Sequence, residues 1–164
     1  MIMTDNIYLL LGSNLGNRNE LLKTAIKLIT LHLGEVLGTS KLYETAPWGI
    51  SDQPAFLNQV VKINSSLLPE DMLAKIQFIE TNMGRIRHEK WGERKIDIDI
   101  LYYNDLVYNS SELKIPHPEI LNRKFTLIPL AELSPEFTHP VLHLSNSELL
   151  AKCDDLLQVN ELEI

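Results

Sequence analysis

Isoleucine and aspartate alternate through residues 96–100, and this alternation predicts a β-strand. Successive side chains of a strand point to opposite faces, so the isoleucines line one face while Asp97 and Asp99 share the other. The two carboxylates then lie about 6 to 7 Å apart and repel each other unless a cation lies between them. A solvent-exposed face would explain one such acid. The acid-bearing face is expected to continue with Leu101 and Tyr103, which favours a covered surface instead.

Strands and helices are predicted to alternate over the first hundred residues. Apolar runs predict three further strands, at residues 7–12, 36–45 and 55–64. Apolar side chains at helical spacing predict two helices, one from about residue 17 to Gly34 and one from Pro69 to Gly84. The order βαββαβ predicts an α+β fold of the ferredoxin-like kind, with helices packed on an antiparallel sheet.

The remaining residues are expected to form a C-terminal extension. Asn104 and Asp105 are predicted to turn a short hairpin, and the prolines between residues 113 and 135 to limit regular structure to short pieces. One helix is expected near residues 146–153. Nothing marks a domain boundary, so residues 1–164 are expected to form a single domain.

Composition excludes several classes of protein. A net charge of −7 makes a general nucleic-acid binder improbable, because affinity for the phosphate backbone comes from massed lysine and arginine. The single cysteine, Cys153, rules out an intrachain disulfide framework and a cysteine-rich zinc site. No apolar run is long enough for a membrane span, so we expect a cytoplasmic protein. No feature marks an oligomer interface, so we expect a monomer.

A basic segment precedes the aspartate pair. Residues 85–95 carry five basic side chains against two acidic ones in an otherwise acidic chain. Arg85, Arg87 and Arg94 are fork donors suited to phosphate oxygens, while Trp91 either packs this segment or covers a ligand. The alternative is a surface loop whose arginines pair with its own glutamates. A position directly before two carboxylates favours an anionic ligand.

Asp97 and Asp99 are interpreted as ligands of Mg²⁺, which is commonly held by one or two carboxylates together with substrate phosphates. This arrangement would suit phosphoryl or nucleotidyl transfer. Gln77 and Glu80 share a helical stripe with Leu73 and could face a ligand, although such residues are more often exposed to solvent.

Two further motifs remain open at this point. His117 lies between two prolines and either donates to a phosphate or caps a loop. The glycine-containing turn at residues 12–16 has no Walker lysine, and it is as well explained by an ordinary capped turn as by a ligand loop.

Taken together, these motifs resemble the 6-hydroxymethyl-7,8-dihydropterin pyrophosphokinases of folate biosynthesis. The segment KWGERKIDIDIL fits the family signature, a basic residue and glycine shortly before R-x-x-D-hydrophobic-D-hydrophobic. It is joined in order by GSNLGN, by YET-P-G with QP-FLN, by Q-x-x-E before GRIR, and by PHP with N-R-x-F. The resemblance implies transfer of the pyrophosphoryl group of ATP to the hydroxymethyl oxygen of the reduced pterin, which releases AMP.

The resemblance also implies a role for individual residues. Asp97 and Asp99 would bind two Mg²⁺ ions, while Arg85, Trp91 and Arg94 would belong to a catalytic lid. ATP would be bound on the nucleotide side by Leu73, Gln77, Glu80, Arg87, Arg94, Ile100, His117 and Arg123. The pterin would lie between the rings of Phe56 and Phe125, with its edge recognised by Thr45, Asn58 and the segment Pro47, Trp48 and Gly49.

Two rival functions remain compatible with the same fold. A nucleotidyl transferase or cyclase would release pyrophosphate instead of AMP, and a regulatory domain would bind a nucleotide without turnover. The acidic net charge disfavours a nucleic-acid substrate, and the aromatic and arginine motifs disfavour a module that only binds.

Overall fold

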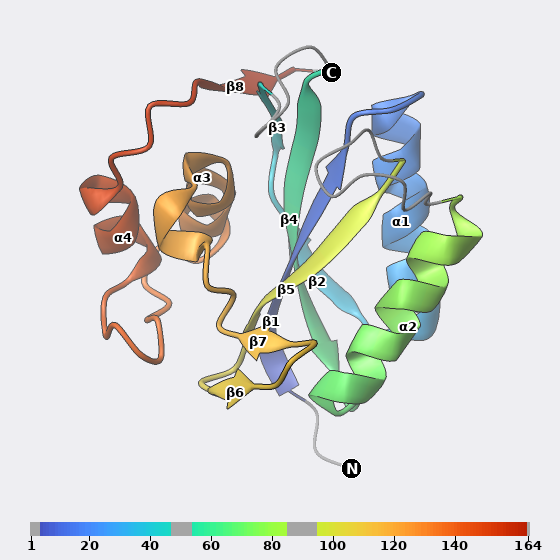
Figure 1. Cartoon of the computed structure of the whole chain (residues 1–164), viewed down its shortest axis with the longest axis horizontal. Coiled ribbons are helices and arrows are strands. Elements are labelled where there is room, and N and C mark those ends of the chain that lie inside the picture. Colours follow the sequence, from blue (N-terminus) through green and yellow to red (C-terminus); the bar gives the residue numbers. More distant parts are fainter. Residues whose placement is uncertain (1–3, 47–53, 85–94, 164) are drawn as a thin grey trace.

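An antiparallel sheet forms the centre of the computed structural model, which describes residues 4–46, 54–84 and 95–163 (Figure 1). Its strand order is β5-β1-β4-β3-β8, with β2 paired to β4. These strands are β1 (Thr4–Ser13), β2 (Val36–Thr39), β3 (Leu42–Thr45), β4 (Phe56–Ser65), β5 (Asp97–Tyr103) and β8 (Val159–Leu162). The predicted α+β class, with helices packed on an antiparallel sheet, is confirmed.

Helices α1 (Arg18–His32) and α2 (Pro69–Asn82) cover one face of the sheet (Figure 1). Asn17 caps α1, because its side-chain oxygen accepts a hydrogen bond from the backbone N–H of Glu20. Both helices bury an apolar stripe against the isoleucines and leucines of β1, β4 and β5. The two predicted helices are therefore confirmed to within one or two residues at each end.

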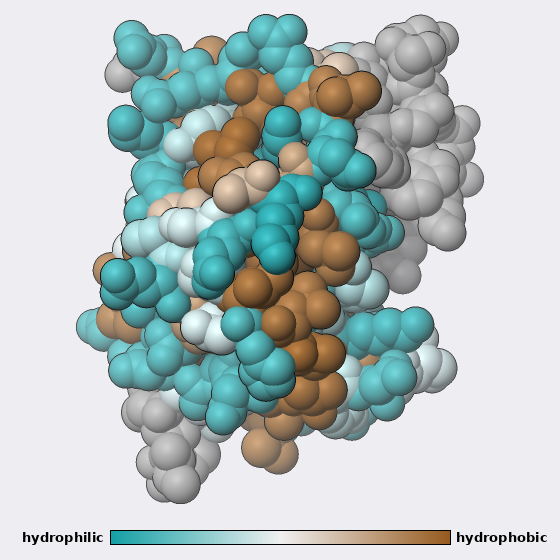
Figure 2. All heavy atoms as spheres, turned by 90° about the vertical axis from the view of Figure 1, so that its left-hand side faces the viewer, coloured by the Kyte–Doolittle hydropathy of each residue, from teal (hydrophilic) through white to brown (hydrophobic). Residues whose placement is uncertain are grey.

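The opposite face is covered by α3 (Lys124–Leu133) and α4 (Asn146–Lys152) (Figure 1). A second core forms here around Tyr8, Tyr102 and Leu130. The outer surface of this layer mixes apolar with hydrophilic side chains (Figure 2). Helix α4 was predicted, but the expectation that prolines limit the preceding segment to short pieces is wrong. Pro129 lies inside the ten residues of α3, where burial of its neighbours offsets the missing backbone hydrogen bond.

A β-bulge interrupts β5 at Leu101. Leu9 pairs with Ile100 and Tyr8 with Tyr102, so Leu101 has no partner of its own on β1. Leu101 and Tyr102 therefore both pack into the second core, while Tyr103 returns to the face covered by α1 and α2. The predicted alternation is correct from Ile96 to Leu101, but the expectation that Tyr103 shares the face of the aspartates is wrong.

Three other local predictions differ from the structure. The strand expected at residues 36–45 is split at Ser40, whose hydroxyl accepts a hydrogen bond from the backbone of β4. The turn at residues 104–105 does not lead to a strand that pairs with β5. It leads to β6 (Tyr108–Asn109), which pairs with β7 (Lys114–Ile115). A short 3-10 helix, Ile120–Asn122, follows β7. Strand β8 was not predicted, because a polar four-residue edge strand leaves almost no periodic signal.

Within the described ranges, no helix is both long and apolar enough to cross a membrane.

Candidate active site

Asp97 and Asp99 lie half-buried on the sheet face that carries the second core. Asp97 is directly opposite Gly12 on β1, and Asp99 is opposite Leu10. Gly12 is in turn opposite Asn58 on β4. Directly opposed residues of antiparallel strands share a face, so Asp97, Gly12 and Asn58 form one row across three strands. With about 4.8 Å between neighbouring strands, the outer two backbones of this row are roughly 10 Å apart.

Gly12 lies in the middle of this row, where the side chains of Asn58 and Phe56 come close to its backbone. A Cβ atom at this position would lie 3.0 Å from Oδ1 of Asn58 and 3.7 Å from a ring carbon of Phe56. The absence of a side chain at Gly12 therefore lets the amide of Asn58 pack closely against β1. In the sequence this glycine is recognisable only as part of a turn, and its position opposite Asp97 follows from the strand register.

The donor set fits a hard divalent cation. Two carboxylates on one face of a rigid strand are ligands that Mg²⁺ prefers, provided that substrate phosphates complete its coordination. Among the described residues no cluster of three or more histidine, cysteine, aspartate or glutamate side chains could hold a metal. This arrangement suits a magnesium ion that arrives with a polyphosphate better than a closed structural site.

The bulge holds His117 near Asp99. The carbonyl oxygen of Leu101 accepts a hydrogen bond of 2.9 Å from the backbone N–H of His117. Nδ1 of His117 accepts a hydrogen bond of 3.1 Å from the backbone N–H of Glu119, which assigns the ring proton to Nε2. Burial lowers the pKa of His117, while the nearby charge of Asp99 opposes this shift. His117 is thus a neutral imidazole with one N–H to donate.

Strand β5 is an edge of the sheet, and α2 closes part of that edge. Glu80 is buried and accepts a hydrogen bond of 3.0 Å from the backbone N–H of Ile98. The backbone N–H of Ile98 therefore points away from β1. Backbone groups two residues apart point to the same side of a strand, so the N–H and C=O of Ile100 also point away from β1. Leu73 is half-buried on the same helix and Gln77 is exposed, so only part of the predicted stripe is buried.

The residues predicted to hold the pterin are found at the other end of this face. Thr45 and Phe56 are register partners at the end of the β3–β4 ladder. Asn58 is buried and donates a hydrogen bond of 3.0 Å to Oγ1 of Thr45. Phe125 is buried near the start of α3 in the core on the same side of the sheet, with the guanidinium of Arg123 5.6 Å from its ring centre.

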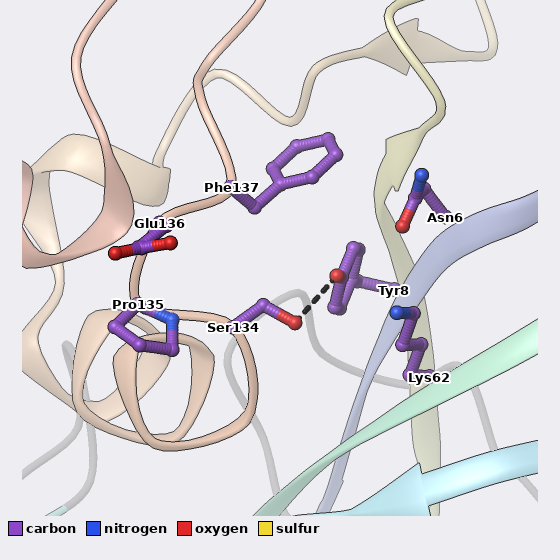
Figure 3. Close-up of a pocket in the computed structure, with 7 residues that line it drawn as sticks. All are labelled: Asn6, Tyr8, Lys62, Ser134, Pro135, Glu136 and Phe137. Atoms are coloured by element: carbon purple, nitrogen blue, oxygen red, sulfur yellow. Dashed lines mark hydrogen bonds between the residues drawn. The ribbon is translucent and has the colours of Figure 1, made fainter.

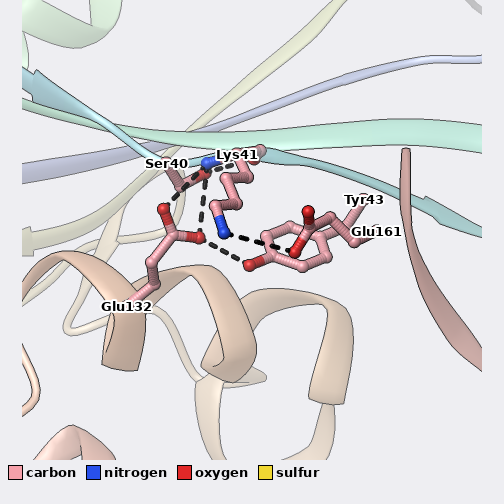
Figure 4. A network of polar contacts seen from close by, with 5 residues as sticks. All are labelled: Ser40, Lys41, Tyr43, Glu132 and Glu161. Carbon is pink, nitrogen blue, oxygen red and sulfur yellow. Dashed lines mark hydrogen bonds and ion pairs between the residues drawn. The ribbon is translucent and has the colours of Figure 1, made fainter. Parts of the chain in front are cut away.

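A carboxylate near the end of α3 attaches this helix to β3. Glu132 accepts hydrogen bonds from the backbone N–H of Lys41, at 3.0 and 3.3 Å, and from the phenol of Tyr43, at 2.5 Å (Figure 4). Burial raises the pKa of Tyr43, and the hydrogen bond to Glu132 raises it further, so the phenol remains a donor. Tyr43 is opposite Asn58, so this network extends the row that begins at Asp97.

Several predicted site residues lie outside the described part of the chain. They are Pro47, Trp48, Gly49, Arg85, Arg87, Trp91 and Arg94.

A cavity of about 350 Å³ lies away from these residues, further toward the N-terminal end of β1 (Figure 3). Its lining includes the ring of Tyr8, the hydroxyl of Ser134 that accepts a hydrogen bond from Tyr8, and the ring of Phe137. It contains none of the predicted site residues.

Comparisons with known proteins agree on one family. The sequence model described as 7,8-dihydro-6-hydroxymethylpterin-pyrophosphokinase (HPPK) matches residues 8–135. The chain is 44% identical over 135 residues to 2-amino-4-hydroxy-6-hydroxymethyldihydropteridine pyrophosphokinase of Aquifex aeolicus, a match that covers 82% of this chain and 84% of that protein. For the protein of the same name in Porphyromonas gingivalis, the identity is 42% over 140 residues, with 82% and 93% covered.

Other relatives are much longer than this chain. The folic acid synthesis protein fol1 of Pneumocystis carinii is 43% identical over 154 residues, which cover 94% of this chain but 21% of that protein. A crystal structure of wild-type HPPK-DHPS from Plasmodium falciparum with pteroate superposes with a TM-score of 0.77 at 22% identity, covering 92% of this chain and 42% of that one. This last likeness concerns the fold alone. The matching family model and the two bacterial relatives show that the chain belongs to the 7,8-dihydro-6-hydroxymethylpterin-pyrophosphokinase family, as its sequence motifs predicted.

Proposed function

We propose that this chain transfers the pyrophosphoryl group of ATP to the hydroxymethyl oxygen of 6-hydroxymethyl-7,8-dihydropterin, giving AMP and the pterin diphosphate for tetrahydrofolate biosynthesis. The row formed by Asp97, Gly12 and Asn58 is the observation that carries the proposal. It joins one carboxylate of the aspartate pair, suited to metal-bound phosphates, to a buried amide beside an aromatic ring. Gly12, which has no side chain, lies between them, where the phosphate and the acceptor would meet.

Asp97 and Asp99 would hold two Mg²⁺ ions on the polyphosphate side of this row. When bound, Mg²⁺ neutralises charge on phosphate oxygens and makes a coordinated hydroxyl more acidic. The two aspartates would orient the phosphate chain toward the space above Gly12. His117 would donate its Nε2 proton to a phosphate oxygen without itself carrying charge.

ATP would lie along the free edge of β5. The outward backbone groups of Ile100 suit the hydrogen-bonding edge of a purine, with Leu73 and Gln77 on one side and His117 and Arg123 on the other. Glu80 accepts a hydrogen bond from the backbone of Ile98 on β5, so we assign to it the role of positioning that edge. The resemblance adds Arg87 and Arg94 as phosphate contacts, and Arg85 and Trp91 as parts of the catalytic segment.

The pterin would lie between the rings of Phe56 and Phe125. A flat heterocycle is recognised by stacking together with a few directed polar groups, which Asn58 and Thr45 supply here. The resemblance adds the segment Pro47, Trp48 and Gly49 at the edge of the pterin. The strand order β5-β1-β4-β3 supports the ferredoxin-like arrangement, and a biosynthetic step that consumes ATP supports a cytoplasmic location.

Product analysis tests the proposed reaction. Purified protein is mixed with Mg²⁺, ATP and 6-hydroxymethyl-7,8-dihydropterin, and AMP, ADP and pyrophosphate are separated by chromatography. We expect AMP that depends on the pterin. Asp97→Asn keeps the shape of the side chain but removes its charge, so it should lower the rate by about 100-fold or more, the scale for losing one electrostatic contact to a transition state.

Asp105→Asn is the matched control, because this aspartate is exposed in the turn after β5. It should retain the wild-type rate. Release of pyrophosphate would indicate a nucleotidyl transferase instead, and nucleotide binding without turnover would indicate a regulatory domain.

A further inference from the structure

Arg18, the first residue of α1, connects the ends of two neighbouring strands. One of its terminal nitrogens, Nη1, lies 3.0 Å from the carbonyl oxygen of Ala55 and 2.6 Å from Oε2 of Glu44. Glu44 directly precedes Thr45 on β3, and Ala55 directly precedes Phe56 on β4. One guanidinium therefore holds both strands next to the last pair of their ladder.

The turn between β1 and α1 makes a second contact with the same strand. Asn14 is buried in this turn, and its side-chain Nδ2 donates a hydrogen bond of 3.2 Å to the carbonyl oxygen of Pro54. Arg18 and Asn14 thus contact consecutive carbonyl groups, at Ala55 and Pro54, where the chain enters β4. The glycine-containing turn at residues 12–16, whose role the sequence left open, leads directly into Asn17, which caps α1, and through Asn14 it also contacts the start of β4.

The position of Arg18 is not explained by helix stability. A cation in the first turn of a helix lies beside the positive end of the helix dipole, which is unfavourable. The Arg18 and Glu44 side chains are also 26% and 35% exposed, and ion pairs that face solvent add little to the free energy of unfolding. The local effect is larger, because β3 and β4 pair over only three registered positions and Thr45 and Phe56 form the last of them.

We propose that Arg18 is a positioning residue that sets Thr45 and Phe56 for the pterin, acting through Glu44 and Ala55 from the opposite face of the sheet. This inference rests on the proposed function, because it assumes that Thr45 and Phe56 contact the pterin. Arg18 itself touches neither substrate. Loss of its contacts lets the end of the β3–β4 ladder open, so the pterin encounters a less ordered site while the ATP edge on β5, at the other side of the sheet, is unchanged.

Steady-state kinetics with each substrate varied in turn tests the proposal. Arg18→Met keeps the length of the side chain and removes its donors. It should raise the KM for the pterin roughly tenfold, leave the KM for ATP within about twofold, and leave the thermal midpoint nearly unchanged. Glu44→Gln removes only the ion pair and should give a smaller rise in the same constant. Arg18→Lys, which restores the charge, should recover part of the pterin affinity.

Lys23→Met is the matched control on the same helix, because among the described residues Lys23 forms an exposed ion pair of 3.6 Å with Glu20 and no contact with β3 or β4. Its constants should equal those of the wild type. If Arg18→Met leaves the pterin KM unchanged, or weakens both substrates together with the thermal midpoint, the inference is overturned while the proposed function stands. If the wild type itself yields no pterin-dependent AMP, both the proposed function and the inference about Arg18 are contradicted.

Discussion

At the scale of single residues, Gly12 is the position where a small change should have the most specific effect. Gly12→Ala would place a Cβ atom 3.0 Å from Oδ1 of Asn58, closer than ordinary van der Waals contact. The amide of Asn58 must then move, at a cost of about 1 to 3 kcal/mol, whereas the ring of Phe56, 3.7 Å away, stays in ordinary contact. We expect a pterin KM about tenfold higher in steady-state assays, with an unchanged circular dichroism spectrum.

Gly38→Ala provides the comparison. Its Cβ would lie 3.5 Å from Leu133, an ordinary contact, and Gly38 lies on β2 rather than in the row of the aspartates. This variant should bind the pterin normally. Equal behaviour of the two variants would contradict the assignment of the space above Gly12 to the substrates.

At the scale of elements, the attachment of α3 to the sheet depends on Glu132. Glu132→Ala removes the acceptor shared by the backbone of Lys41 and the phenol of Tyr43 (Figure 4). We expect the free energy of unfolding to fall by about 1 to 2 kcal/mol in urea titrations, because the nearly buried phenol loses its partner. Lys41→Ala retains its backbone N–H and should cost no more than about 0.5 kcal/mol. A larger loss in Lys41→Ala than in Glu132→Ala would show that the contact between Lys41 and Glu161 matters more.

The elements also show where sequence reasoning succeeds. The alternation in β5 and the apolar stripes of α1 and α2 are local patterns with a fixed period, so the sequence alone predicts them. The split at Ser40 and the strand β8 depend on partners far along the chain, and such partners cannot be predicted from the local spacing of apolar residues. The same difference applies to the candidate site. The aspartate pair is visible in the sequence, whereas the opposition of Asp97 to Gly12 and the link from Arg18 to Glu44 follow only from the register.

At the scale of the whole molecule, stability should depend on pH through the second core. His139 is buried there, and its Nδ1 accepts hydrogen bonds from the backbone N–H groups of Val141 and Leu142. Burial, with a smaller contribution from the charge of His143, lowers the pKa of His139 below the value of about 6.5 expected in an unfolded chain. Between the lowered pKa and 6.5 the unfolded state binds more protons, so the free energy of unfolding falls as the pH falls through this window.

Urea titrations between pH 7.5 and pH 5, a range chosen to bracket roughly the unfolded pKa of 6.5, measure this dependence. His139→Asn retains an acceptor near the position of Nδ1 but cannot be protonated, so its stability should fall less on acidification. The exposed His143→Asn should retain most of the wild-type slope. A slope that is identical in the wild type and in His139→Asn would assign the effect to other groups.

The bulge at Leu101 makes the length of β5 as important as its composition. Deleting this one residue would preserve every aspartate, isoleucine and tyrosine and would leave Tyr102 and Tyr103 opposite Tyr8 and Ile7 on their present faces, but it would remove an apolar side chain from the second core. It would also remove the carbonyl oxygen that accepts the hydrogen bond from the backbone N–H of His117. A designer who transplants the aspartate pair to another antiparallel hairpin would therefore have to carry the extra residue along, since its carbonyl oxygen holds the backbone of the histidine that lies near Asp99.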